Sequence, residues 1–426
     1  MTAADLPTTA RPATETSKLG PRPPAASRII ELIRRAALPA AIIYLVNDWS
    51  SGLRDALALI AALWLLRAPG RARTVLRNTP PVVWFLAWAA WSLLSILWAD
   101  HIVIALRDGF KFVPVVAGTF ALAALLYPQA TVDRVLLWIT VGLTLAFSID
   151  AGLWLAGFGA QAEGYVRWEA ARAFQHPNTY SGLIVASLPL AFLRLGDRHS
   201  PGWAKAVALV QCATAALLLW AFASRTAQVA LVASAALGLI LVLGRWGLLA
   251  TALLIALSAV AAPHFNPRFT EPSMSNLTHR FEVWEGTLEL IGEHPVIGHG
   301  WGMRNFSTTY YARHPERSEE FWHPHDLGLE ITYGTGLIGL SLFGAAWVSL
   351  ARALARLRAT GDATARRLAT ALIVSLGASL VFSLADSPHG AYWIFLWTVF
   401  GIAAGLTGRS AAPHSPPATR PDPLSA

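Results

Sequence analysis

The residues best suited to chemistry gather in the stretch 264–326, which lies between two long apolar segments. This stretch contains five arginines and seven histidines and ends in His323-Pro324-His325-Asp326, whereas only 14% of the whole chain is charged. Titratable groups concentrated in one polar loop of an otherwise apolar protein indicate an enzyme site at a water-facing surface.

His325 has the placement expected of a proton acceptor. Asp326 is positioned to cap the following helix through its side-chain oxygen, which would hold His325 just outside the first turn. The positive end of a helix disfavours imidazolium, and a neutral imidazole is a competent general base. The alternative is that His323 and His325 are polar interfacial residues at a helix start, and either histidine could be the base.

Arg280 lies in the first turn of a predicted amphipathic helix that ends at Gly292 and Pro295. Apolar residues recur there at three and four residues, which predicts a helix on the membrane face of the protein. These residues are Leu277, Phe281, Trp284, Leu288 and Ile291. The glycines of 298–302 that follow allow tight turns and close approach to a ligand. Two interpretations of Arg280 remain open. Either it binds an anionic ligand, or it is a solvated loop charge or an anchor for lipid phosphates.

Three further sets of arginines fall on the same predicted side of the membrane. Arg225, in Ser224-Arg225-Thr226, sits between two apolar runs with almost no loop. An arginine at membrane depth costs roughly 2.5 to 3.5 kcal/mol on insertion scales and usually faces a polar cavity or an anion, although it can also reach the outer headgroups. Arg167 and Arg172 lie in the loop 158–178, where both could simply be solvated, and Arg304 lies in the long loop.

The elements that must position these residues are transmembrane helices. With 55% hydrophobic residues and a mean hydropathy of +0.48, the chain has too much apolar surface for an ordinary globule. Its solid apolar runs predict an all-α polytopic membrane protein with about twelve spans and exclude the alternating pattern of a β-barrel. The predicted spans are 36–49, 53–67, 80–98, 111–127, 134–157, 179–195, 203–222, 226–242, 246–262, 326–350, 367–386 and 390–407.

The distribution of Lys and Arg predicts that both termini are cytoplasmic and that the large loop 263–325 is outside. The net charge of +8 then follows from topology, which argues against nucleic-acid binding. The Pro-rich ends 1–27 and 410–426 are expected to be disordered, leaving 28–409 as the membrane domain.

Arginines that converge at a lipid boundary suit an anionic headgroup such as a pyrophosphate, because guanidinium groups bind phosphate oxygens in a planar, bidentate way. The chain has no Asp-x-Asp pair of the kind that holds a cation in metal-dependent glycosyltransferases. We therefore expect the arginines to neutralise the leaving group, with no metal and no cofactor.

Together these motifs resemble the O-antigen ligase and polymerase superfamily. The resemblance lies in Arg280-x-x-x-Trp284, the Gly-rich run 294–302, His325-Asp326-Leu327-x-x-Glu330 and the run 333–339, and it covers roughly 224–340. The family often has His-Asn where this chain has His325-Asp326.

The resemblance implies an inner-membrane glycosyltransferase of lipopolysaccharide biosynthesis that works on the periplasmic face. It would move a glycan from undecaprenyl pyrophosphate to a hydroxyl of lipid A–core, by a metal-independent, inverting displacement. By motif position, His325 would be the base, and Arg280 and Arg225 would hold the pyrophosphate. Substrate-binding residues would be Arg167, Arg172, Arg304, His323 and Trp284.

Other activities use the same donor or the same headgroup. An O-antigen polymerase or a protein O-oligosaccharyltransferase differs only in its acceptor, although the latter usually carries a longer domain after its spans. A transporter or flippase of the lipid-linked sugar keeps charged residues along a path inside the membrane. Here the predicted spans are nearly free of charge, which favours a ligase.

Overall fold

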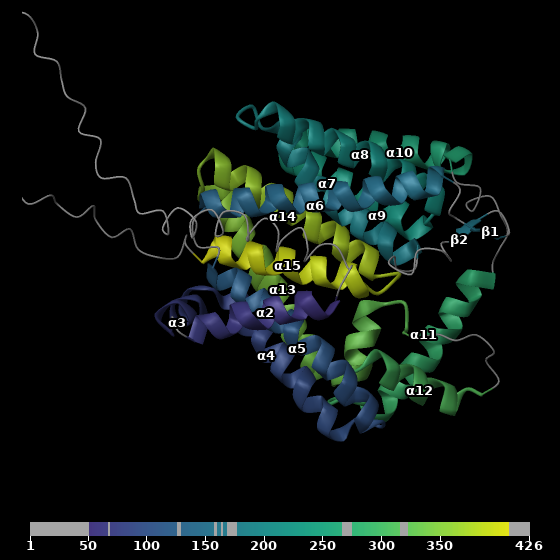
Figure 1. Ribbon diagram of the computed structural model, residues 1–426. Coiled ribbons are helices and arrows are strands. Elements are labelled where there is room, and N and C mark those ends of the chain that lie inside the picture. The colour runs from purple at the N-terminus through teal and green to yellow at the C-terminus, as the bar shows by residue number, and fades with distance from the viewer. Residues whose placement is uncertain are drawn as a thin grey trace, which may run out of the picture. The chain divides into compact units, whose positions relative to one another are not determined.

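The computed structural model describes residues 51–66, 69–125, 129–156, 160–162, 165–167, 177–265, 275–315 and 323–408. Within these ranges the chain is almost entirely helical (Figure 1), which confirms the predicted fold class. The helices of the first half are α2 (Ser51–Leu66), α3 (Pro69–Asn78), α4 (Pro80–Leu94), the 3-10 turn η1 (Ser95–Trp98), α5 (Ile102–Leu125), α6 (Gln129–Leu155), α7 (Pro177–Gly196) and α8 (Gly202–Phe222). Those of the second half are α9 (Arg225–Leu243), α10 (Arg245–Phe265), α11 (Ser275–Glu293), α12 (Met303–Arg313), α13 (Leu327–Thr360), α14 (Ala363–Ser383) and α15 (Gly390–Thr407).

Nine of the described helical segments are long and apolar enough to cross a membrane, and each coincides with a predicted span. They are α4 with η1, α6, α7, α8, α9, α10, α13, α14 and α15. Of the other three predicted spans, 36–49 lies outside the described residues, 53–67 corresponds to α2, and 111–127 lies in α5, which already begins at Ile102. The chain is therefore a multi-pass membrane protein.

The interior helices pack through large aromatic side chains. Helix α13 lies along α4, α14 lies against α7 and α9, and α15 lies against α5. Between them, the ring of Trp88 stacks on that of Trp397 with 5.1 Å between centroids, and Phe85 and Phe400 complete the cluster. Helix α10, in contrast, exposes Leu253 (60%) on its surface, as expected where a helix faces lipid. These four rings join α4 to α15, the helix that begins beside the candidate site.

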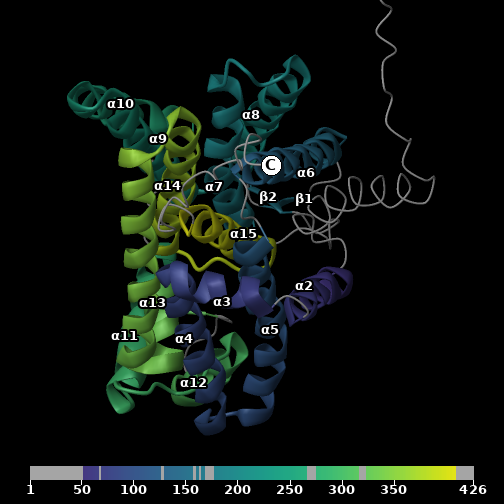
Figure 2. The same cartoon turned by 90° about the vertical axis from the view of Figure 1, so that its left-hand side faces the viewer.

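The long loop contains two helices, α11 and α12, which Figures 1 and 2 show together beside α13. The predicted amphipathic helix is confirmed as α11. Its protein-facing stripe, however, is formed by Val283, Thr287 and Leu290, which are buried. Phe281 (61%) and Leu288 (56%), part of the predicted apolar stripe, point outward and would face lipid. The all-α prediction includes no strands, but the described parts of the loop 158–178 include two short paired antiparallel strands, β1 (Ala160–Ala162) and β2 (Tyr165–Arg167).

Helix α13 is broken at Gly336, where φ is +64° and ψ is −171°. The break frees backbone groups that water cannot reach, and the loop after α11 pairs with them. The carbonyl of Tyr333 accepts from the amide of His299 at 2.7 Å, and the amide of Leu337 donates to Pro295 at 2.9 Å. Trp91 of α4 donates its Nε1 proton to the carbonyl of Thr335 at 2.9 Å. The loop 294–300 is thereby fixed against the break.

The glycines of this loop serve that close packing. Gly298 has a φ of +73°, and a Cβ there would lie 2.6 Å from the Tyr333 carbonyl and from the Thr335 and Gly336 amides. From their spacing in the sequence, these glycines are expected to approach a ligand. In the structure, the groups that Gly298 approaches most closely are backbone atoms of α13.

Replacing Gly336 with alanine is expected to destabilise the protein strongly. The new Cβ would collide with the backbone of Val296, and alanine disfavours a positive φ. We expect a markedly lower thermal midpoint in detergent and less monodisperse protein on size-exclusion chromatography. Gly344→Ala in the same helix is the control, because a Cβ at Gly344 meets nothing within 4 Å. Equal melting of the two variants would contradict this account of the break.

Asp150 is an exception to the expectation that the spans are nearly free of charge. It lies inside α6, is 1% exposed, and accepts a hydrogen bond from the hydroxyl of Tyr180 on α7. A buried carboxyl inside a span must be hydrogen-bonded to be tolerated, and Tyr180 supplies the bond. Asp150 therefore joins α6 to α7.

Candidate active site

His325 lies at the start of α13 in an unusual backbone conformation, with a φ of +57°. Asp326 caps the helix as predicted, because its side chain accepts from the amide of Leu329 at 2.8 Å. These constraints turn the imidazole of His325 toward Asp386, in the turn between α14 and α15, where Nδ1 lies 3.1 Å from Oδ1. Since a carboxylate only accepts, the proton of a neutral ring lies on Nδ1 and the lone pair on Nε2.

Asp386, in the turn between α14 and α15, was not among the residues singled out from the sequence. Asp386 is 2% exposed, and its backbone amide donates to Phe382 at the end of α14. Burial alone would raise the pKa of Asp386. The hydrogen bond from His325 and the positive charge of Arg280 outweigh burial and hold that pKa below its usual value. Asp386 is therefore an ionised partner for the imidazole.

Arg280 reaches this turn, and Arg225 lies within electrostatic reach of Arg280. Arg280, on α11, donates from Nη1 to the carbonyl of Ala385. Its burial lowers its pKa, the charge of Asp386 raises it, and the charge of Arg225 lowers it further. Arg225 is the first residue of α9, after Ser224, whose side chain caps that helix by accepting from Ala227. Two arginines from distant parts of the sequence thus lie within electrostatic reach of each other, and Arg280 also lies within reach of Asp386.

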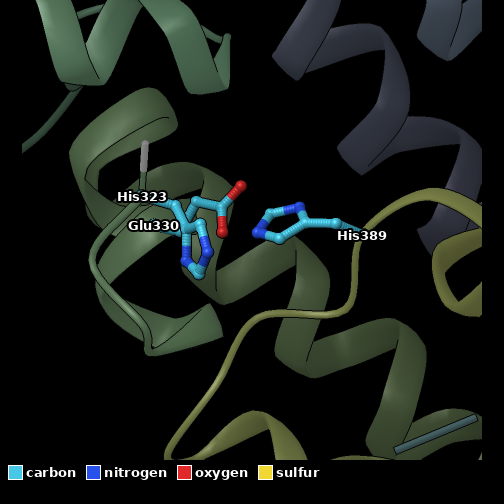
Figure 3. Close-up of side chains that lie close together, drawn as sticks. All are labelled: His323, Glu330 and His389. Atoms are coloured by element: carbon cyan, nitrogen blue, oxygen red, sulfur yellow. The ribbon is translucent and has the colours of Figure 1, made fainter. Parts of the chain in front are cut away.

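Other aromatic and imidazole rings enclose His325. Trp284 of α11 donates its indole proton to the carbonyl of Pro324 at 2.8 Å. The ring of His323 lies 4.2 Å from that of His325 and 4.1 Å from that of His389. His389 precedes α15 and was not singled out from the sequence; its enclosure lowers its pKa to about 4, so the ring is neutral near pH 7. Figure 3 shows the carboxylate of Glu330, from α13, between the rings of His323 and His389.

The remaining predicted site residues are not brought to this cluster by any described contact. Arg304 is the second residue of α12, and its backbone amide donates to the carboxylate of Asp108 on α5 at 3.1 Å. Only the backbone of Arg167, at the end of β2, is described. Arg172 lies outside the described residues. The cluster around His325 therefore consists of Arg280, Arg225, Trp284, His323, Asp386, His389 and Glu330.

A second histidine–aspartate pair stabilises the loop next to the site. Nδ1 of His299 lies 2.9 Å from Oδ2 of Asp100, and Nε2 lies 2.7 Å from the carbonyl of Leu290. Both partners only accept, so both ring nitrogens of His299 carry protons and the ring is an imidazolium. Burial would lower the pKa of His299, but the hydrogen bonds to Asp100 and Leu290 raise it above 6.5.

The protein is expected to lose stability as the pH rises above 6.5, through the raised pKa of His299. A group whose pKa is raised on folding stabilises fully below its unfolded value and loses that contribution as the pH passes its folded value. The thermal midpoint of the wild type should fall as the pH rises above 6.5, whereas the midpoint of His299→Gln should not show this fall. The control is His199→Gln, which replaces an exposed histidine and should keep the pH dependence of the wild type. Parallel curves for wild type and His299→Gln would contradict the assignment.

Most residues of this cluster lie in a part of the chain that matches a known protein family. Residues 182–344 match a family model described as O-antigen ligase. This region belongs to the O-antigen ligase family. Arg225, Arg280, Trp284 and His325 lie inside the O-antigen ligase region, whereas Asp386 follows it in sequence. No curated protein matches the chain.

Proposed function

We propose that this protein is an O-antigen ligase of the bacterial inner membrane. It would transfer a glycan from undecaprenyl pyrophosphate to a hydroxyl of lipid A–core on the periplasmic face. The observation that carries the proposal is the pairing of His325 with Asp386 beside Arg280, since it joins a base and an anion-binding group. The family match of residues 182–344 supports the same activity.

His325 would act as the general base. With its Nδ1 proton donated to Asp386, the Nε2 lone pair accepts the proton of the acceptor hydroxyl. The hydroxyl oxygen forms a bond to the anomeric carbon of the glycan while the bond from that carbon to the pyrophosphate oxygen breaks. The electron pair leaves with the pyrophosphate, and attack from the opposite side inverts the anomeric centre. Asp386 is a positioning residue, because it acts through the imidazole.

Arg280 and Arg225 would bind the pyrophosphate and stabilise the charge that it gains as the bond breaks. In the absence of an anion the two guanidinium groups repel each other, and this repulsion contributes to the lowered pKa of Arg280. A pyrophosphate between them would relieve the repulsion, and its charge would be strongly felt because Arg280 is largely shielded from water. This arrangement gives the arginines the role that a metal ion has in other glycosyltransferases.

The surface beside the site suits a lipid-linked donor. Phe281 and Leu288 of α11 are 61% and 56% exposed, and Leu337 of α13 is 52% exposed. Trp284, from the same helix as Phe281, lies between this apolar surface and the His325 segment. The polyprenyl chain could remain in the bilayer against these side chains while its headgroup reaches the arginines.

The acceptor distinguishes the ligase from its alternatives. Purified protein in detergent or liposomes is given a lipid-linked glycan with either lipid A–core or a second lipid-linked glycan. Product on lipid A–core is the expected result. Growth of the second glycan instead would indicate a polymerase, transfer to a protein hydroxyl would indicate a protein O-oligosaccharyltransferase, and movement of the donor across the bilayer without transfer would indicate a flippase.

A further inference from the structure

Three side chains of types that bind metal ions come together next to His325. His323, Glu330 and His389 each offer one ligand atom, and these atoms all lie within 4.8 Å of one another. They come from the segment before α13, from its first turn and from the residue before α15. Figure 3 shows them directed toward a common point.

Two of these three groups have ligand atoms without a present role. Oε2 of Glu330 and Nε2 of His389 are buried, and neither atom makes a hydrogen bond of normal geometry to a described residue, although the Ser387 hydroxyl interacts with the Glu330 carboxyl. A buried carboxylate oxygen or imidazole nitrogen without a partner is costly, since it has lost its bonds to water. A cation between the two atoms would satisfy both of them.

We propose that His323, Glu330 and His389 form a binding site for a zinc-class dication. Two imidazoles and one carboxylate are a donor set typical of Zn²⁺, with a fourth position left for water. Ligand atoms around a tetrahedral zinc ion lie roughly 3.4 Å apart, given bonds of about 2.0 to 2.2 Å. The observed limit of 4.8 Å is wider than that spacing, so the three side chains would have to draw together around the ion.

A second set, formed by His323, His325 and Asp386, meets the same distance limit. There His325 and Asp386 already bind each other at 3.1 Å, so an ion would have to displace an existing interaction. The group containing Glu330 and His389 gains interactions for two unpartnered atoms instead. The ion therefore belongs to His323, Glu330 and His389.

Binding of the ion would disturb His325. The amide of His325 donates to Nδ1 of His323 at 3.1 Å, which helps to hold the positive φ of His325. If the metal binds Nδ1 of His323, the lone pair that accepts from the His325 amide is used by the metal. If the metal binds Nε2 of His323, the ring proton moves to Nδ1, which then cannot accept. In either case the hydrogen bond from His325 is lost. The metal would thus displace His325 from its position against Asp386.

This consequence makes the site inhibitory, and that part of the inference rests on the proposed function. The transfer step itself remains metal-independent, because its charges are handled by Arg280 and Arg225. An ion of this class in the compartment of the active site would lower transfer without competing directly for the pyrophosphate. The proposal has two separate parts, binding of the ion and its effect on transfer.

Binding is tested on the full-length protein without any glycan. Metal-free protein in detergent is titrated with Co²⁺, whose tetrahedral complexes absorb strongly in the visible range, and with Zn²⁺ in competition. We expect one ion per chain, about tenfold or more weaker binding in Glu330→Gln and in His389→Gln, and unchanged binding in His264→Ala, an exposed histidine at the end of α10. Thermal melting of each variant confirms that it is folded. Absence of a tetrahedral Co²⁺ signal in the wild type, or binding as tight as that of the wild type in both ligand variants, would overturn the site.

The effect on transfer is measured separately. Zn²⁺ is expected to inhibit wild-type transfer, with recovery on chelation, and to inhibit the residual activity of Glu330→Gln only at about tenfold higher concentration. Binding without inhibition would overturn the coupling to His325 while leaving the site intact. If the protein transfers no glycan under any condition, the proposed function fails, and the Co²⁺ titration still decides whether the site exists.

Discussion

Replacing His325 with alanine is expected to lower the turnover number of glycan transfer by about 10²- to 10⁴-fold, the usual contribution of a general base. The protein should still fold. Alanine has the same Cβ as histidine, so it adds no new strain at a φ of +57°, and Trp284 still binds the carbonyl of Pro324. The measurement is the initial rate of transfer to lipid A–core at saturating donor, together with the thermal midpoint of each protein.

Two controls make this prediction specific. His264→Ala removes an exposed histidine of the same long loop region and should retain wild-type turnover. His323→Ala removes the neighbouring candidate base; because its ring faces Glu330 and His389, we expect a smaller loss than in His325→Ala. Near-normal turnover of a folded His325→Ala variant would exclude this imidazole as the base, and a larger loss in His323→Ala would transfer the role to His323.

The spans were largely predictable because a membrane imposes a simple requirement on sequence. A helix in lipid satisfies its backbone internally and needs a continuous apolar run, and nine such runs coincide with described helices. The cap at Asp326 was also predictable, since a side-chain oxygen before an apolar run is a local signal. The break at Gly336 was not, because a glycine inside an apolar segment looks the same in a straight helix as in a broken one.

The candidate site was only partly predictable for a related reason. Hydropathy and charge assign residues to a side of the membrane but give no lateral distance within that side. Arg304 and Arg280 are predicted on the same side of the membrane, but only the structure shows that the amide of Arg304 binds Asp108 on α5. Asp386 was missed because it pairs with a residue far away in sequence. The available signal was its isolation, since Asp386 is the one acidic residue of the stretch 385–390, where the last two apolar segments meet.

Replacing Asp386 with asparagine is expected to lower turnover by about 10²- to 10⁴-fold, with little change in the KM for the lipid-linked donor. The carboxylate accepts the Nδ1 proton of His325 and thereby keeps the Nε2 lone pair available to the acceptor. An amide can turn its NH₂ group toward Nδ1, which places the ring proton on Nε2, and the corresponding change in Ser-His-Asp enzymes costs about 10⁴-fold in rate. Loss of the negative charge also leaves Arg280 and Arg225 at least as attractive to a pyrophosphate, so donor binding should not weaken.

The matched control is Asp100→Asn, which alters the other histidine–aspartate pair at a similar distance, 2.9 Å against 3.1 Å. Asp100 holds the imidazolium of His299 and accepts from Thr309, so its loss should lower the thermal midpoint with turnover close to wild type. A positioning role for Asp386 requires the opposite pattern, in which turnover falls far more than stability. If Asp386→Asn instead raised the donor KM and left turnover intact, Asp386 would act on donor binding, and His325 would need another partner to fix its tautomer.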